Sequence, residues 1–226
     1  MPKQPETRPW PAGERRSCEL VIFDLDGTLV DSFGLFISIY NSLAGRYRLK
    51  PLSLDEAERL RQSSPREIMA RVGLPYRKLP WIARDFMSLM GQRRHETALF
   101  GGIGRVLHEL HGRGLRLAVV SANSLENCRR MLGDDIGGLM DCIEGGASLF
   151  GKHRRIRRVL AILGVQPGRA IYVGDQLPDA DAARAAGVAF GAVSWGYGAP
   201  EALARQRPDI TFARVEDLGL LAPRGP

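Results

Sequence analysis

Residues 20–32 read LVIFDLDGTLVDS: an unbroken apolar run over residues 20–23 is followed by two aspartates, Asp24 and Asp26, spaced two residues apart. Runs without polar alternation are typical of strands that are buried on both faces of a parallel sheet. Asp24 and Asp26 therefore follow a predicted strand over residues 20–23 and lie at its carboxyl end. That end is the edge at which open α/β sheets bind ligands.

The two carboxylates of this motif repel each other unless a cation lies between them or one of them is protonated, and either arrangement is useful in catalysis. Gly27 permits a tight turn, and Thr28 offers a hydroxyl and an amide to an anion. In most sequences an Asp-x-Asp pair is only a solvated turn. Here it follows four apolar residues and precedes Gly-Thr, so it predicts a functional motif.

Three further apolar runs, over residues 117–120, 170–173 and 188–193, have the same character. Helical patterns lie between them. Residues 103–112 carry apolar side chains at helical spacing and end at a glycine, and the alanine-rich residues 179–186 also precede a glycine. Alternating helices and strands with short links predict right-handed βαβ units. We therefore expect an α/β fold with a Rossmann-like core built on a parallel sheet.

One long segment interrupts this alternation. Residues 32–97 contain no convincing strand, and several helical patterns follow one another, separated by prolines where helices should begin or end. We expect this segment to be an inserted α-helical cap domain, with the core formed by residues 18–31 and 98–226. Residues 1–17 contain four prolines and no periodicity, and are expected to be a flexible leader.

Composition limits the class of protein and its partners. The chain has 226 residues and a formal net charge of +7, which favours an anionic partner such as a phosphorylated metabolite or a nucleic acid. The basic run at residues 152–158 lacks the interleaved aromatic residues of a nucleic-acid patch, so we expect a solvated helix face and no nucleic-acid partner. Three widely spaced cysteines, no secretory signal and no apolar run near ~20 residues predict a cytoplasmic protein outside the membrane.

Polar residues also follow the strand predicted over residues 117–120. Ser121 and Asn123 offer a hydroxyl and an amide to phosphoryl oxygens. The alternative is a plain turn in which Ser124 caps the next helix.

Two more candidate positions lie further along the chain. Lys152 opens a predicted helix, where a cation opposes the helix dipole, so it is either a surface residue or the partner of an anion. Asp175 and Asp179 follow the strand over residues 170–173, and acidic residues there suit a hard cation such as Mg²⁺. Asp175 is the better placed ligand. Because strand ends meet at one edge of a parallel sheet, all these residues are expected to converge.

The order of these motifs resembles that of the haloacid dehalogenase-like hydrolase superfamily. The residues that carry the resemblance are Asp24-x-Asp26-Gly27-Thr28, Ser121, Lys152 and Gly174-Asp175-x-x-x-Asp179. Within the superfamily the chain is most similar to phosphoglycolate phosphatases, which carry a helical cap inserted after the first strand. The stretch 193–198, VSWGYG, also resembles a loop of those enzymes.

The resemblance implies a Mg²⁺-dependent phosphatase acting on a small, anionic phosphomonoester of the phosphoglycolate type. Asp24 would be the nucleophile that forms an aspartyl-phosphate, and Asp26 would be the general acid and then the general base. The metal would be held by the Asp24 carboxylate, the Asp26 carbonyl and Asp175, with Asp179 orienting the metal's surroundings. The phosphate-binding residues would be Gly27, Thr28, Ser121, Asn123 and Lys152.

Other functions stay open at this point. Relatives that displace halide lack an acid two residues after the nucleophile, so Asp26 favours phosphoester cleavage. A phosphosugar mutase, in which Asp24 carries phosphate between two hydroxyls, is the nearest alternative. A non-catalytic module that binds nucleic acid or protein is a third. Gln176 and His153 depart from the residues usual in the family, which leaves the subfamily open, and the predicted cap has no motif that identifies the substrate.

Overall fold

The computed structural model divides the chain into two compact units. Unit 1 comprises Met1–Asp31 and Leu99–Pro226, and unit 2 comprises Ser32–Ala98. The residues that the structure describes are 18–60, 65–74, 76–93, 96–146 and 151–222. The predicted leader, residues 1–17, lies outside them.

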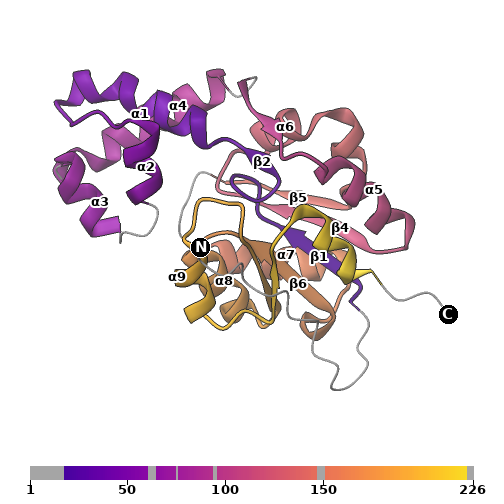
Figure 1. Cartoon of the computed structure of the whole chain (residues 1–226). Helices are drawn as coiled ribbons and strands as arrows, with labels where there is room; N and C mark the ends of the chain where they lie inside the picture. The colour runs from indigo at the N-terminus through magenta and orange to yellow at the C-terminus, as the bar shows by residue number, and fades with distance from the viewer. Residues whose placement is uncertain (1–17, 61–64, 75, 94–95, 147–150, 223–226) are drawn as a thin grey trace. The chain divides into compact units, whose positions relative to one another are not determined.

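Unit 1 is built on a six-stranded sheet with the order β5-β4-β1-β6-β7-β8, and every neighbouring pair is parallel (Figure 1). This arrangement confirms the predicted α/β class with a parallel-sheet core. The strands are β1 (Leu20–Phe23), β4 (Arg116–Val120), β5 (Cys142–Glu144), β6 (Ala170–Gly174), β7 (Ala189–Val193) and β8 (Ile210–Phe212).

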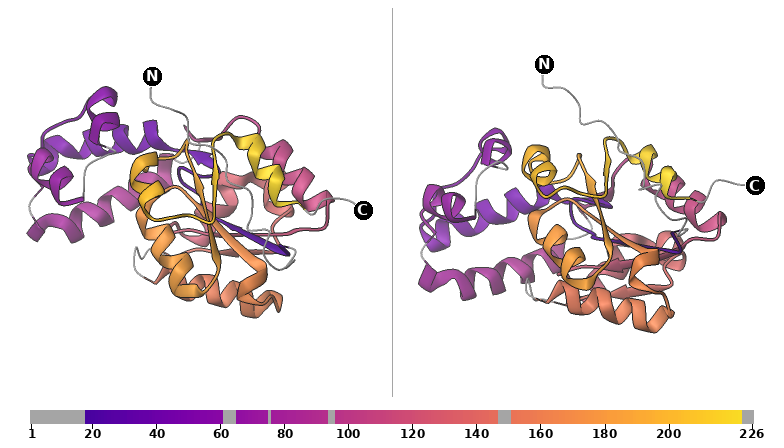
Figure 2. Two further views of the ribbon diagram at one scale, coloured as in Figure 1. Left: turned by 60° about the horizontal axis from the view of Figure 1, so that its bottom comes forward. Right: turned by 90° about the horizontal axis from the view of Figure 1, so that it is seen from below.

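Helices cover both faces of this sheet (Figure 2). On one face lie α5 (Ile103–Gly112), α6 (Leu125–Gly138) and the 3-10 segment η4 (Val215–Leu221). On the other lie α7 (Lys152–Leu163), α8 (Leu177–Ala186) and α9 (Pro200–Arg205), and η3 (Pro167–Arg169) precedes β6.

The two-sided burial explains the apolar runs in the sequence. In β1, Val21 and Phe23 pack in the cluster that includes α5 and α6, whereas Leu20 and Ile22 pack in the cluster that includes α7 and α8. All four side chains are fully buried. Each buried side chain of this size stabilises the fold by about 1.5–3 kcal/mol, so neither face tolerates a polar residue.

Unit 2 is helical among its described residues. Its elements are α1 (Phe33–Tyr47), α2 (Leu54–Leu60), α3 (Pro65–Val72), the 3-10 segment η1 (Tyr76–Lys78) and α4 (Leu79–Arg93). A small apolar core joins α1 to α4 through Leu35, Ile39, Leu43 and Met90. The short strands β2 (Val30–Asp31) and β3 (Ala98–Leu99) pair where the chain leaves and re-enters unit 1. That unit 2 serves as a cap stays a prediction.

No helix within the described part of the chain is both long enough and apolar enough to cross a bilayer. The three cysteines are free thiols, with Cys18 and Cys128 buried. The assignment to the cytoplasm stays a prediction.

Candidate active site

The strands at the centre of the sheet end at the same level. Phe23, the last residue of β1, is in register with residues near the ends of both neighbours, β4 and β6. Asp24, Ser121 and Asp175 each follow one of these three strands directly. The structure therefore places these residues, distant in the sequence, at one edge of the sheet.

A cluster of buried carboxylates lies at this edge. Asp24, Asp175 and Asp179 each offer an oxygen, and these oxygens all lie within 4.8 Å of one another. Their exposed fractions are 5%, 0% and 1%. Burial raises the pKa of Asp24 to about 7, and it raises the pKa of Asp175 well above the usual value. A cluster of this kind needs compensating positive charge.

Lys152, the first residue of α7, supplies part of that charge. Its Nζ lies 2.6 Å from Asp179 Oδ1 and 3.0 Å from Asp24 Oδ1. Burial alone would lower the pKa of Lys152, but the neighbouring carboxylates outweigh burial and hold that pKa well above its usual value. The ammonium also lies over the ring of Tyr172, 5.6 Å from its centroid. Lys152 is thus the partner of anions, and the surface alternative is wrong.

The charges of this cluster fit a divalent cation. Three carboxylates and one ammonium carry a formal charge of −2, which one divalent ion would cancel. The oxygen donors are those that Mg²⁺ prefers. Metal ions of this hardness are commonly held by one or two carboxylates together with water and substrate oxygens. The residues present therefore fit Mg²⁺.

Asp175 is held through both of its oxygens. The Thr28 hydroxyl donates to Oδ1 at 3.0 Å, and the backbone N–H of Tyr197 donates to Oδ2 at 2.7 Å. The indole N–H of Trp195 donates in turn to the backbone carbonyl of Thr28 at 3.0 Å. Thr28 therefore orients a carboxylate, and its predicted contact with phosphate stays a prediction.

Gly27 has a packing role at this site. Its φ is +80°, and a Cβ at this position would lie 2.4 Å from Asp175 Oδ2. Its backbone N–H donates to the carbonyl of Val30 at 2.9 Å, which closes the turn after β1. These contacts explain the glycine by its conformation and by the space that Asp175 occupies. The predicted contact of Gly27 with phosphate is not tested by them.

Asp179 contacts the backbone as well as Lys152. Its Oδ2 accepts from the backbone N–H groups of Asp175, at 3.1 Å, and of Gln176, at 2.9 Å. A Cβ on Gly174 would lie 2.6 Å from the same oxygen. Asp179 thus fixes the turn between β6 and α8, and its other oxygen faces Lys152.

Asp26, which is half-buried, interacts with the loop after β4. Its Oδ2 accepts a hydrogen bond from the side-chain amide of Asn123. Asn123 is itself buried, and its backbone N–H donates to the Ser121 hydroxyl at 3.1 Å. The Asn123 amide thus contacts Asp26 in this structure, and its predicted contact with phosphate stays a prediction. Ser124 does cap α6, accepting from the backbone N–H of Asn127 at 3.2 Å.

Three contributors to the site were given no role from the sequence. The backbone N–H of Tyr197 has no residue-type signature, because any residue except proline provides one. The ring of Tyr172 was visible only as part of an apolar run, and the indole of Trp195 only as part of the stretch 193–198, to which no role was assigned. The signal that was available is the pair of glycines that flank Tyr197 in residues 193–198.

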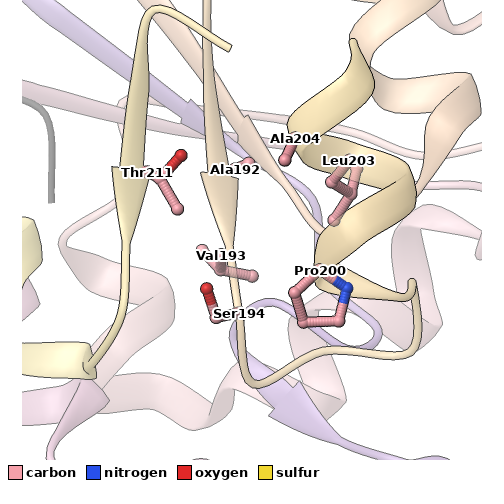
Figure 3. A pocket seen from close by; sticks show the side chains of 7 residues that line it. All are labelled: Ala192, Val193, Ser194, Pro200, Leu203, Ala204 and Thr211. Atoms are coloured by element: carbon pink, nitrogen blue, oxygen red, sulfur yellow. The ribbon is translucent and has the colours of Figure 1, made fainter. Parts of the chain in front are cut away.

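A separate pocket lies between β7, β8 and α9 (Figure 3). Its lining includes Val193, Ser194, Pro200 and Thr211, and none of its seven lining residues has an ionisable side chain. It contains none of the predicted site residues, so it offers no acid, base or metal ligand. The carboxylate cluster is therefore the candidate site within the described part of the chain.

Known proteins are similar to this chain in sequence. The model of the haloacid dehalogenase-like hydrolase family matches residues 21–193. A phosphoglycolate phosphatase from Synechococcus elongatus is 32% identical over 205 residues, covering 88% of this chain and 95% of that protein. One from Aquifex aeolicus is 31% identical over 216 residues, covering 88% and 94%.

Solved structures are similar to this chain in fold. A haloacid dehalogenase-like family hydrolase from Streptococcus pneumoniae superposes with a TM-score of 0.75 at 24% identity, covering 89% of this chain and 97% of that one. CbbY from Rhodobacter sphaeroides, solved in complex with phosphate, gives 0.67 at 26% identity and covers 89% and 96%. The expected fold class and the expected enzyme class, a phosphatase, are confirmed. This chain belongs to the haloacid dehalogenase-like hydrolases.

Proposed function

We propose that this protein hydrolyses a small, anionic phosphomonoester of the phosphoglycolate type through an aspartyl-phosphate on Asp24. The observation that carries the proposal is the buried ion pair of Asp24 with Lys152, beside the carboxylates of Asp175 and Asp179. A carboxylate that is buried at the end of the central strand costs stability, so its presence calls for a functional explanation. The phosphoglycolate phosphatases named above support the substrate class.

Asp24 must be ionised to act as a nucleophile. Burial favours its neutral form, and the ammonium of Lys152 at 3.0 Å favours the charged form. In the first step an Asp24 oxygen forms a bond to phosphorus, and the bond from phosphorus to the leaving oxygen breaks. Lys152 would bind phosphoryl oxygens next to Asp24, and the Ser121 hydroxyl lies in the loop after β4.

Asp26 would move the protons. In the first step it gives a proton to the leaving oxygen, and in the second it takes a proton from the water that attacks phosphorus. The second step releases inorganic phosphate and restores the Asp24 carboxylate. Asn123 holds Oδ2 of Asp26 as an acceptor, so a proton carried by Asp26 would lie on the other oxygen.

The divalent ion would be held by the carboxylates of Asp24 and Asp175, with the Asp26 carbonyl as the third protein ligand that the family resemblance implies. When bound, Mg²⁺ neutralises charge on the phosphoryl group during transfer. Asp179 would serve as an orienting residue, since its oxygens face Lys152 and two backbone N–H groups.

The test is turnover of 2-phosphoglycolate and of a panel of sugar phosphates by the purified protein with Mg²⁺, followed as release of inorganic phosphate. We expect activity that is lost on chelation and abolished by Asp24→Asn. Acid-quenched enzyme should carry phosphate in the wild type but not in that variant. Isomerised sugar phosphate without free phosphate would indicate the mutase. Turnover retained by Asp24→Asn would remove Asp24 as the nucleophile.

A further inference from the structure

We propose that residues 194–198, here named the clamp loop, fix the orientation of the Asp175 carboxylate and thereby set the affinity of the site for its divalent cation. This inference rests on the proposed function, in which Asp175 is a metal ligand. It assigns positioning roles to Trp195 and Gly196, which lie outside the carboxylate cluster itself.

Hydrogen bonds from the clamp loop control both oxygens of Asp175. The Tyr197 backbone N–H donates directly to Oδ2 at 2.7 Å. The other oxygen is held by Thr28, whose own backbone carbonyl accepts from the Trp195 indole at 3.0 Å. The loop thus acts on Oδ2 directly and on Oδ1 through Thr28, so that the carboxylate is held at two points.

Steric contact makes the clamp rigid. A Cβ on Gly196 would lie 2.1 Å from Asp175 Cβ and 2.5 Å from the Gly27 carbonyl oxygen. A Cβ on Gly198 would lie 2.0 Å from the backbone oxygen of Asp175. Neither glycine has a positive φ, so it is the space, and not the backbone conformation, that excludes a side chain. The opposing atoms are backbone atoms or the Cβ and Cγ of Asp175, close to its backbone, so they cannot move aside as the far end of a flexible side chain would.

Both ends of the clamp loop are anchored in unit 1. Ser194 continues β7, and its N–H donates to the carbonyl of Phe212 at 3.0 Å. Pro200 begins α9, and Figure 3 shows Ser194 and Pro200 at the two ends of the connection. The ring of Trp195 packs against the core cluster of the sheet. The loop is therefore a fixed part of the core unit and positions Asp175 without needing a ligand.

The physical consequence concerns metal binding. A ligating carboxylate that is already oriented by hydrogen bonds loses less freedom when it binds a cation, and its lone pairs point to the metal position. Changes to such supporting partners typically lower metal affinity by about 10- to 100-fold. We therefore expect alterations of the clamp loop to weaken metal binding and to leave the chemical step intact once metal saturates the site.

The test compares Gly196→Ala and Trp195→Phe with wild-type protein, and uses Gly112→Ala as a matched control. Gly112 ends α5, and a Cβ there meets nothing within 4 Å. The Kd of Mg²⁺ is measured by calorimetric titration of chelator-treated protein, and urea unfolding without metal checks that each variant is folded. The dependence of turnover on Mg²⁺ is measured separately.

We expect the Kd to rise by about 10- to 100-fold in Gly196→Ala and by up to about 10-fold in Trp195→Phe. The control should bind as the wild type does, and kcat at saturating Mg²⁺ should stay within about threefold of wild type, since the machinery is unchanged. If Gly196→Ala does not fold, Trp195→Phe decides alone. An unchanged Kd in folded variants would contradict the positioning role of the clamp loop. A kcat that saturating Mg²⁺ does not restore would contradict it as well. Failure of the wild type to bind Mg²⁺ would instead overturn the proposed metal site.

Discussion

The side-chain nitrogen of Lys152 lies 3.0 Å from Oδ1 of Asp24, so the first residue of α7 forms an ion pair with the residue that follows the central strand. Both side chains are largely buried, with 14% and 7% exposed. The helix N-terminus disfavours a cation, and burial disfavours both charges. Stability alone therefore does not explain the pair, whereas the proposed role of Asp24 as a nucleophile that must stay ionised does.

Replacing this cation should impair catalysis strongly. Lys152→Met removes the ammonium that opposes the effect of burial on Asp24, so the pKa of that carboxyl in the metal-free protein should rise above about 7 and less of the proposed nucleophile will be ionised. We expect kcat/KM to fall by about 100-fold or more, as for loss of other groups that stabilise developing charge. Steady-state kinetics near pH 7 measure this, and circular dichroism checks the fold. Near-normal kcat/KM would contradict the role of Lys152.

Asn123 should affect proton transfer more than phosphate binding. Its amide donates to Asp26, so Asn123→Ala frees the carboxyl that we propose as the general acid. Substrates with an alkoxide leaving group need that acid, whereas p-nitrophenyl phosphate does not. We expect kcat for 2-phosphoglycolate to fall by about 10-fold or more and kcat for p-nitrophenyl phosphate to change little.

Ser124→Ala is the matched control in the same loop, because Ser124 caps α6. It should lower the free energy of unfolding by about 1 kcal/mol and leave turnover of both substrates unchanged. Equal losses on both substrates in Asn123→Ala, with a raised KM, would return Asn123 to the phosphate-binding role.

The central strands were predictable because four or five consecutive residues are buried on both faces. β1, β4, β6 and β7 all coincide with apolar runs. β5 and β8 were not predicted. Each has three residues and lies at an edge of the sheet, so neither produces a run long enough to stand out from the adjoining turns.

The grouping of Asp24, Lys152 and Asp175 was predictable for a related reason, since parallel strands deliver the residues that follow them to one edge. The direction of individual hydrogen bonds was not. Whether the Asn123 amide meets phosphate or Asp26 depends on a side-chain rotamer that no sequence pattern records. The donor from Tyr197 is a backbone group, and its identity depends on the path of a loop.

The stability of the metal-free protein should decrease as pH rises. Burial raises the pKa of Asp24 from 3.8 to about 7, so the folded state binds this proton more tightly than the unfolded state does. The contribution of this proton to the free energy of unfolding is fully present below about pH 4 and is lost as pH rises to about 7. Its magnitude is on the order of a few kcal/mol. The pKa of Asp175 is raised as well. Mg²⁺ favours the ionised carboxylates, so it should stabilise the protein more at high pH.

Thermal unfolding with and without Mg²⁺ at pH 5 and pH 8 measures this effect as a difference at each pH, which removes other pH-dependent contributions. We expect the rise in Tm on adding Mg²⁺ to be clearly larger at pH 8. Asp24→Asn cannot ionise at this position, so the pH dependence should become smaller in that variant, and the contribution of Asp175 should remain. A rise in Tm that is the same at both pH values would contradict the linkage between metal binding and ionisation.

Asp179 should behave as an orienting residue whose charge is essential. One oxygen accepts from two backbone N–H groups and the other from Lys152, so an amide in either orientation places an NH₂ group against a donor. Asp179→Asn should lower the free energy of unfolding by on the order of 3 kcal/mol, as for a broken buried pair. It should also weaken Mg²⁺ binding by about 10- to 100-fold without abolishing it.

Two further variants, Asp175→Asn and Asp181→Asn, serve as comparisons for Asp179→Asn. The first replaces a proposed ligand and should prevent saturation by Mg²⁺ in the calorimetric titration. The second changes an exposed carboxylate two residues further on, which pairs with Arg184, and should match the wild type in unfolding and in metal affinity. If Asp179→Asn also removes Mg²⁺ binding altogether while the protein stays folded, Asp179 is a ligand in its own right. If the variant is as stable as wild type, the contacts of Asp179 with Lys152 and the backbone do not stabilise this edge of the sheet.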